Sequence, residues 1–266
     1  TLSTARPTTA LTLGLELIKG NPEQRIAASL LLGGLSPAPR EVVFALRDLT
    51  RDVDPHVGRV AAPELLAVDP KALDWARGTV VSSTGALAGL RVLGAQAAAA
   101  DLPLVLGRVA EERFRGEALF ALESFAREVV LAHVRSMTKV TATRDERLAA
   151  AVVLGTFACG ADVAALEHLT HDVDPRVRDA AFAGLYHRDV DAARARAHEF
   201  VGGAHAPVAV ELLRGRTDPE AHDALCGLAW SPKFARGLVA EALGGFDTER
   251  ARAIRALYGL STATTE

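Results

Sequence analysis

Histidine is the residue type whose spacing first suggests chemistry, because imidazole binds metal ions and transfers protons near neutral pH. His168 and His171 lie three residues apart at the end of an expected helix, and His187 ends the next one, an arrangement with which three imidazoles could hold a metal ion. No fourth ligand accompanies them, which favours scattered surface histidines, and we therefore predict no metal site. Six of the eight histidines fall within 55 residues: His168, His171, His187, His198, His205 and His222.

Other reactive residue types do not form a catalytic pattern. Ser–His–Asp, phosphate-loop and dinucleotide-binding motifs are absent, so we predict no catalytic residue and no cofactor. Cys159 and Cys226 lie in apolar helical segments, where a free thiol behaves as a small hydrophobic side chain. Free thiols are typical of reducing compartments, which predicts a cytoplasmic location.

The composition predicts an all-α fold. Hydrophobic residues make up 49% of the 266 residues and aromatic residues only 5%, with alanine and leucine prominent among the helix formers. Charged residues and glycine interrupt every apolar stretch before 18 residues, so we expect no membrane span. The chain starts at Thr1 and its one methionine is Met137, from which we expect that residue 1 is not the natural start.

Charge disfavours nucleic acid as a partner. The net charge is −3, with 14 basic and 15 acidic side chains in residues 1–133 and 16 and 18 in residues 134–266. A duplex-binding protein gains most of its affinity from a basic surface. Lysine supplies only four of the 30 basic residues, which indicates a GC-rich genome and a bacterial source.

An internal repeat organises the chain. Residues 49–57 (LTRDVDPHV) and 169–177 (LTHDVDPRV) agree at seven of nine positions, and residues 25–33 similarly match residues 147–155. These matches define a unit of about 30 residues with two helical segments. The second segments are expected to begin near Arg25, Arg59, Ala86, Arg115, Arg147, Arg178, Pro207 and Arg236.

Residues at the segment ends fit helix caps. Asp54 and Asp174 each precede a proline, and an aspartate N-cap followed by proline is a favourable helix start. Glycines at the far ends fit the left-handed position after a helix. These glycines are Gly33, Gly94, Gly155, Gly215 and Gly244.

The repeat resembles the HEAT-like family, in its short type that is also found in phycobilisome lyases. The resemblance covers residues 8–260 as a single domain, with 1–7 and 261–266 as flexible ends. It implies an α-solenoid of about eight helix-turn-helix repeats, whose concave surface is lined by the second helices and binds other proteins. The residues that carry it are Asp174, Pro175, Val177, Arg178, Ala180, Ala181 and Leu185.

The recurring arginines could form an anion-binding ladder, but the resemblance implies a structural one. It pairs Arg59 with Asp52 or Asp54, and Arg178 with Asp172 or Asp174, as ion pairs at the turns. The whole structural ladder comprises Arg25, Arg59, Arg115, Arg147, Arg178, Arg236, Asp54 and Asp174.

Helical periodicity predicts what lines the concave surface. If Val177, Ala181 and Leu185 face the core, the same register exposes an apolar strip on the second helices. Such a strip suits a peptide or helix of another protein. Alternatively, the register is shifted by one position and these side chains belong to the core. The predicted partner-binding residues are Leu90, Arg91, Leu119, Phe120, Val152 and Phe182.

These observations favour a non-enzymatic scaffold or adaptor over a HEAT-like enzyme. A bilin-lyase-like modification helper has the repeat type in its favour but no cysteine or histidine motif. HEAT-like DNA glycosylases place an aspartate and aromatic residues in one pocket, for which Trp75, Trp230 and Asp74 are the candidates. Because adjacent helical residues point about 100° apart, Asp74 and Trp75 do not easily share a pocket wall.

Overall fold

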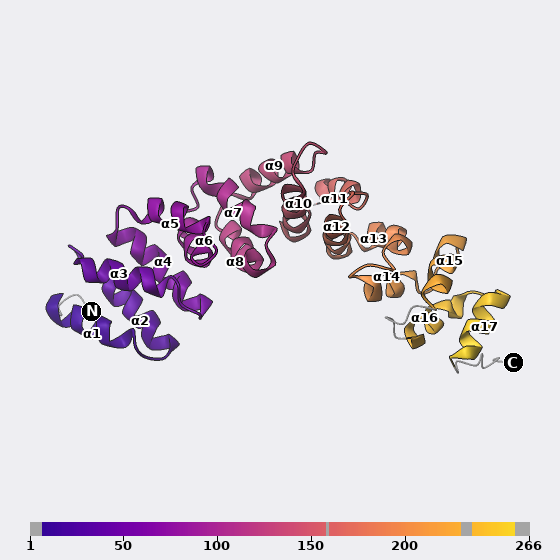
Figure 1. The fold of residues 1–266 in the computed structure, drawn as a ribbon, viewed down its shortest axis with the longest axis horizontal. Coiled ribbons are helices and arrows are strands. Elements are labelled where there is room, and N and C mark those ends of the chain that lie inside the picture. The colour runs from indigo at the N-terminus through magenta and orange to yellow at the C-terminus, as the bar shows by residue number, and fades with distance from the viewer. Residues whose placement is uncertain (1–6, 158–159, 230–235, 259–266) are drawn as a thin grey trace. The chain divides into compact units, whose positions relative to one another are not determined.

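The computed structural model describes residues 7–157, 160–229 and 236–258. Within these ranges the chain forms 17 α-helices and no strand, and helices account for 76% of the chain (Figure 1). The predicted all-α fold is confirmed. No helix in the described ranges has both the length and the apolar character needed to cross a membrane. The predicted flexible ends, apart from residue 7, and Cys159 and Trp230 lie outside the described residues.

The helices belong to two compact units, residues 1–134 and 135–266, and α9 (Arg127–Met137) contains the boundary between them. The single domain expected for residues 8–260 stays a prediction. Unit 1 contains α1 (Pro7–Leu17), α2 (Pro22–Gly33), α3 (Arg40–Leu49), α4 (Pro55–Val68), α5 (Ala72–Val80), α6 (Ala86–Gln96), α7 (Leu102–Val109) and α8 (Glu112–Glu123). Unit 2 contains α10 (Arg144–Phe157), α11 (Val163–Leu169), α12 (Pro175–Arg188), α13 (Val190–Arg196), α14 (Ala206–Leu213), α15 (Pro219–Leu228), α16 (Arg236–Ala242) and α17 (Glu249–Leu257).

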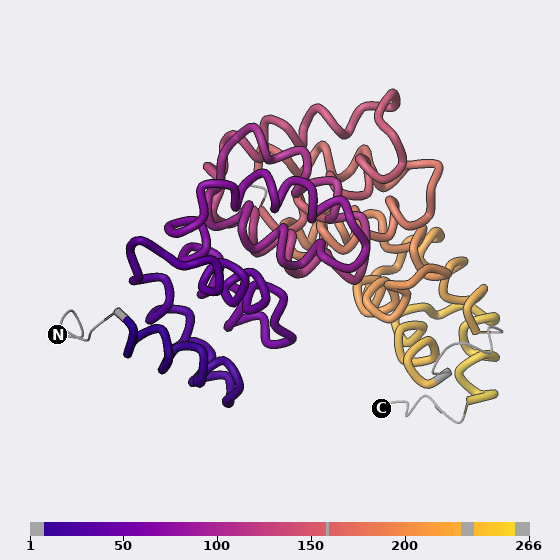
Figure 2. The backbone as a smooth tube through the Cα atoms, turned by 60° about the vertical axis from the view of Figure 1, so that its left-hand side comes forward, coloured from indigo at the N-terminus to yellow at the C-terminus, as the bar shows by residue number. Residues whose placement is uncertain are grey.

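Helices pack against their close neighbours in the sequence. In unit 1, α1 pairs with α2, α3 with α4, α5 with α6 and α7 with α8, and the even-numbered helices α2, α4, α6 and α8 pack against one another in succession. In unit 2, α10 packs on α12, and α11 and α13 also pack on α12. Figure 2 follows the backbone through these successive helices from the N-terminus to the C-terminus. The even-numbered helices are the second segments of the sequence repeat.

The Asp–Pro pattern marks helix starts. The Asp54 carboxylate accepts a hydrogen bond from the His56 amide and the Asp174 carboxylate accepts one from the Arg176 amide, both at 2.8 Å. Prolines at the first helical position leave no amide to satisfy there.

Of the five glycines expected after helix ends, Gly215 is confirmed, because it follows the C-cap residue of α14 in the left-handed conformation. The others have a different role. Gly33, Gly94 and Gly155 lie inside helices, and among the described glycines only Gly215 has a positive φ, of 80°. A Cβ on Gly155 would lie 2.8 Å from the Cα of Gly184, so α10 and α12 approach each other backbone to backbone. A Cβ on Gly94 would similarly meet α8. These glycines allow close packing of consecutive even-numbered helices. The remaining candidate, Gly244, lies in a 3-10 turn.

The turn aspartates pair with arginines of the preceding even-numbered helix. Arg25 donates to Asp52 through Nε at 2.7 Å and Nη2 at 3.1 Å, and Arg147 donates to Asp172 through the same atoms at 2.5 and 3.0 Å. The expected pairing of Arg59 with Asp52 or Asp54 is wrong, because Arg59 binds Glu117 and the preceding hairpin supplies the guanidinium group for Asp52. Arg178 does contact Asp172, but through the backbone carbonyl, and its charge helps to lower the pKa of the Asp172 carboxyl without a direct ion pair. Arg115 differs as well, because it donates to the Val109 carbonyl. The side chain of Arg236 lies outside the described residues, so its place in the ladder stays a prediction.

A second series of ion pairs links the odd-numbered segments, and the sequence did not reveal it. Arginines near the ends of α3, α5 and α9 bind aspartates that precede the next odd-numbered helix, and these carboxylates are almost completely buried. The pairs are Arg47–Asp69 at 2.6 Å, Arg77–Asp101 at 2.7 Å and Arg135–Asp162 at 2.6 Å.

The predicted apolar strip is not exposed throughout. Leu90 and Phe182 have no exposed surface, and the Phe182 ring stacks on Phe200 with centroids 4.3 Å apart. For these two residues the shifted register is correct, and they belong to the core. Val152 is half-buried, whereas Phe120 is 42% exposed.

We expect Asp172→Ala to lower the free energy of unfolding by about 2–4 kcal/mol, because it leaves the buried guanidinium group of Arg147 without the carboxylate that pairs with it. Burial raises the pKa of Asp172, but hydrogen bonds from Arg147 and the Asp174 amide outweigh this and lower it. The stabilisation is therefore present above the ordinary aspartate pKa and disappears as the pH falls below about 4. Urea titrations at pH 7 and pH 3 measure both effects. In the control Asp191→Ala, which removes an exposed pair with Arg194, the change should stay below about 0.5 kcal/mol.

Phe182→Ala should lower the free energy of unfolding by about 3–5 kcal/mol, because it opens a cavity beside Phe200. Phe120→Ala should cost less than about 1.5 kcal/mol, since that ring is partly exposed. Denaturant titration of both variants checks the assignment. Equal losses would contradict it.

Candidate functional site

Three even-numbered helices of unit 1 line a pocket of about 330 Å³. Its residues follow helical spacing, so that each helix turns one face toward the same space. We call it the α4–α6–α8 pocket. Its lining comprises Arg59 and Pro63 of α4, Leu90, Arg91, Gly94 and Ala95 of α6, and Glu117, Phe120, Ala121 and Ser124 on or directly after α8.

Two arginines share one carboxylate in this pocket. Arg59 donates to Glu117 through Nε at 2.9 Å and Nη2 at 3.3 Å, while the Arg91 Nε lies 3.5 Å from the same carboxylate. The side chains of Arg91 and Glu117 are only 2% and 7% exposed. Two guanidinium groups and one carboxylate carry a combined charge of +1, and because Arg91 and Glu117 are almost completely buried, the electrostatic interactions between them are stronger than in water.

Arg91 also holds the turn before α4. Its Nη1 donates to the carbonyl oxygens of Thr50 at 2.7 Å and Asp52 at 3.0 Å. The guanidinium group has room because residue 58 is glycine, and a Cβ there would collide with Nη1. A residue of α6 thus completes the turn of an earlier hairpin.

The other copy of the sequence repeat shows what this arrangement replaces. The position equivalent to Gly58, 120 residues later, is Arg178. Arg178 Nη1 donates to the carbonyl oxygen of Asp172 at 2.8 Å, which corresponds to the Asp52 carbonyl. Arg91 therefore makes from another helix the hydrogen bond that Arg178 makes within its own hairpin. The two copies of the repeated segment are followed by different residues, Gly58 and Arg178, and this difference is the feature of the sequence from which the site could have been found.

Phe120 forms the outer wall of the pocket. The Arg59 Cζ lies over the ring, 3.5 Å from its centroid, which is a cation–π contact. The pocket brings together Leu90, Arg91 and Phe120 from the predicted partner-binding set. Leu119 is half-buried on α8 and does not line it, and Val152 and Phe182 belong to unit 2.

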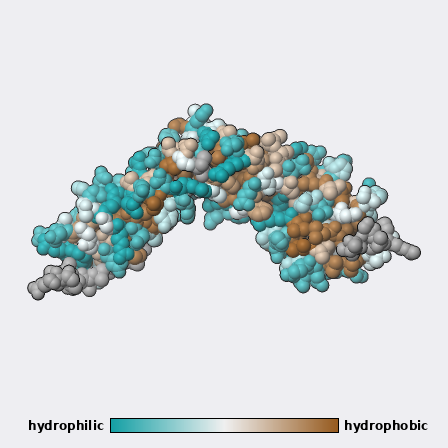
Figure 3. Space-filling view, turned by 180° about the vertical axis from the view of Figure 1, so that it is seen from behind, coloured by the Kyte–Doolittle hydropathy of each residue, from teal (hydrophilic) through white to brown (hydrophobic). Residues whose placement is uncertain are grey.

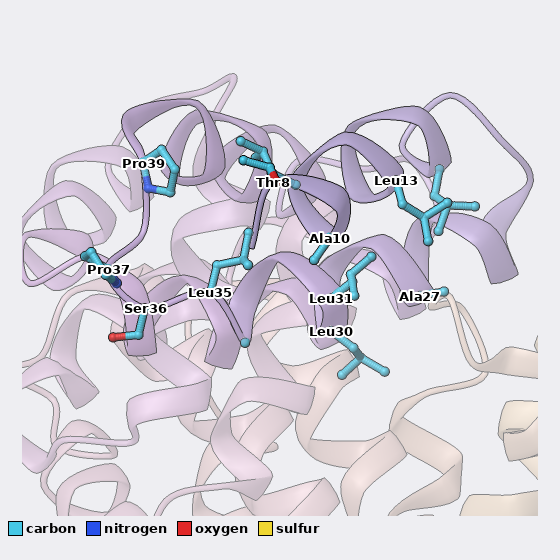
Figure 4. A pocket seen from close by; sticks show the side chains of 13 residues that line it. Thr8, Ala10, Leu13, Ala27, Leu30, Leu31, Leu35, Ser36, Pro37 and Pro39 are labelled. Atoms are coloured by element: carbon cyan, nitrogen blue, oxygen red, sulfur yellow. The ribbon is translucent and has the colours of Figure 1, made fainter. Parts of the chain in front are cut away.

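A larger pocket of about 900 Å³ lies at the N-terminal end of unit 1 (Figure 4). Its walls come from α1, α2 and residues 34–39, and they are almost entirely apolar. Leu13 and Leu30 are 46% and 55% exposed here, and Figure 3 shows the corresponding hydrophobic surface at the right-hand end of the view. Without charged groups, this surface offers hydrophobic contact but little directional recognition.

The histidines of the possible metal site lie on the surface. His168, His171 and His187 are exposed, and the His171 Nδ1 lies 4.0 Å from the Glu199 Oε2. Among the described residues, no three histidine, cysteine or acidic side chains form a group that could hold a metal ion.

Trp75 and Asp74, the described candidates for a glycosylase pocket, both contact arginine side chains. The ring of Trp75 on α5 contacts the guanidinium groups of Arg47 and Arg51, at 5.2 and 5.5 Å from its centroid. Asp74 is exposed and accepts a hydrogen bond from Arg77. Neither residue lines the two pockets described above.

One cysteine–histidine contact has the elements of an activated nucleophile. The Cys226 Sγ lies 3.5 Å from His222 Nε2, and the imidazole also contacts Thr248 Oγ1 at 2.8 Å and Asp223 Oδ1 at 3.2 Å. Cys226, however, has no exposed surface, and burial raises the pKa of its thiol. The protonated thiol is a poor nucleophile, so the contact serves packing at neutral pH.

Comparison with models of known protein families gives no match, and comparison with curated protein sequences gives none either. The resemblance to HEAT-like repeats therefore rests on the residues of this chain.

In a Cys159→Ser variant, Cys226 should react with iodoacetamide at pH 7 at least about 100-fold more slowly in the native protein than in urea. The native reaction is slow because the Cys226 sulfur is not exposed and because its thiol stays protonated. Mass spectrometry of the alkylated protein over time measures both rates. Rapid native alkylation would instead show that His222 activates the thiol.

Proposed function

We propose that this chain is a HEAT-like α-solenoid that acts as a non-enzymatic protein-binding module, with the even-numbered helices lining its concave surface. The succession of packed even-numbered helices within unit 1 and the repeated Asp–Pro turns support this architecture. A free buried thiol and an even charge balance suit a cytoplasmic adaptor whose partner is another protein.

The α4–α6–α8 pocket is the observation that carries the proposal. An exposed phenylalanine stacked on an arginine, beside buried charged groups, has the composition of a binding hot spot. The volume of about 330 Å³ lies at the small end of ligand pockets, a size that suits one or two side chains of a peptide. Partner side chains that enter it would cover Phe120 and gain from its removal from water.

A displayed library of random 12-residue peptides, selected on the immobilised protein, tests this proposal. We expect a shared peptide motif with an affinity near 10 μM, a level that a few buried anchors provide. Phe120→Ser should weaken the selected peptides at least about tenfold, because it removes the aromatic wall.

The matched control is Phe44→Ser, which removes a 62% exposed phenylalanine from α3, an odd-numbered helix. It should leave the affinity unchanged, and circular dichroism should show folded protein for both variants. The proposal fails if no peptide is enriched, or if the enriched peptides bind the Phe120→Ser variant as tightly as the wild type.

A further inference from the structure

We infer that the α4–α6–α8 pocket anchors a carboxylate group of the partner peptide, either an acidic side chain or the C-terminus. This inference rests on the proposed function, since it names the chemical group that the module recognises. It is carried by the arrangement of Arg59, Arg91 and Glu117, which sequence resemblance does not supply.

The cluster of Arg59, Arg91 and Glu117 carries a net positive charge. Among the described residues, Glu117 is the one carboxylate that contacts both guanidinium groups, and it leaves one positive charge without an acidic partner there. The side chain of Arg91 is 2% exposed, and its buried Nε has no hydrogen bond in the described part of the chain. A buried cation is costly unless it is paired and hydrogen-bonded, so an entering anion would complete the cluster.

Both arginines keep hydrogen-bond donors that the cluster does not use. Arg59 uses Nε and Nη2 for Glu117, and Arg91 uses Nη1 for the carbonyl oxygens of the turn. The Arg59 Nη1 and Arg91 Nη2 groups make no hydrogen bond to any described residue. Both guanidinium groups lie within 3.5 Å of the same Glu117 Oε1, so a carboxylate with two oxygens can receive one bond from each arginine.

The charge and the walls of the pocket select among anions. A single carboxylate neutralises a local charge of +1, whereas a phosphate dianion would leave an excess negative charge beside Glu117. Leu90, Pro63 and Phe120 supply apolar walls for the methylene groups that precede a carboxylate. The pocket therefore favours a monoanion on a short hydrocarbon stem.

Hexanoate is a direct probe that requires no knowledge of the partner. In arginine Nε–Hε NMR spectra of the full chain, we expect hexanoate to shift the Arg59 and Arg91 signals with a saturable, millimolar Kd. Hexanamide, which has the same stem without the charge, should leave both signals in place. No shift with hexanoate, or an equal shift with hexanamide, overturns the inference, as does inorganic phosphate binding more tightly than hexanoate.

Two substitutions test the charges in opposite directions. Glu117→Gln removes the competing carboxylate while keeping its shape, and it should tighten hexanoate binding at least about tenfold. Arg59→Gln should weaken it by a similar factor. Arg113→Gln is the matched control, because Arg113 also stacks on a phenylalanine of α8, with Cζ 4.2 Å from the Phe114 centroid, but lies outside the pocket. A purely structural cluster would show no gain in the Glu117→Gln variant, which overturns the inference.

Variants of the selected peptides distinguish a failure of the carboxylate anchor from a failure of the proposed protein-binding function. Replacing their acidic residues by amides tests the side-chain source, and amidating their C-termini tests the terminal source; loss with either change supports the inference. Peptides that keep their affinity after both changes overturn the carboxylate anchor while leaving peptide binding intact. Saturable hexanoate binding without any enriched peptide supports the anchor and overturns the protein-binding function alone.

Discussion

The pair between an even-numbered-helix arginine and the turn aspartate of the next hairpin is the interaction on which the local structure depends. Asp52 receives both Arg25 bonds and also accepts a hydrogen bond from the Asp54 amide at 2.9 Å. This second bond shapes the turn and places Asp54 where its own carboxylate caps the following helix. One carboxylate thus connects two hairpins and sets the start of α4. Asp172 does the same for α12.

The candidate site arises where one turn departs from this scheme. With Gly58 in place of an arginine, the turn before α4 takes its remaining donor from Arg91, and a guanidinium group becomes buried between helices. Glu117 then offsets part of the buried charge, and Arg59 holds Glu117 in position through two hydrogen bonds. Each member of the cluster follows physically from the one before it, because a buried charge requires a partner.

Local patterns in the sequence predicted the helices and their starts, since an Asp–Pro pair acts within one turn of the chain. The α4–α6–α8 pocket could not be predicted in this way, because Arg59 and Glu117 are 58 residues apart and meet only after α4, α6 and α8 have packed. The error at Phe182 has another cause. Residues 180–185 are apolar on most sides of the helix, so periodicity alone does not distinguish the buried face from the half-buried one. Glycine is equally ambiguous, since a turn and a close helix contact both require it.

The span of the Arg59–Glu117 pair affects how unit 1 unfolds. The ion pairs at the turns join each hairpin to its neighbour, and contacts of that range allow a stack of hairpins to open one layer at a time. Arg59 on α4 instead binds Glu117 on α8, across α6, while Arg91 on α6 holds the turn before α4. Separating any one of the three helices breaks charged contacts of the other two. The hairpins that contain α4, α6 and α8 are therefore expected to unfold as one cooperative block. Opening it breaks all the charged contacts of Arg59, Arg91 and Glu117, and not only the packing between two neighbouring hairpins.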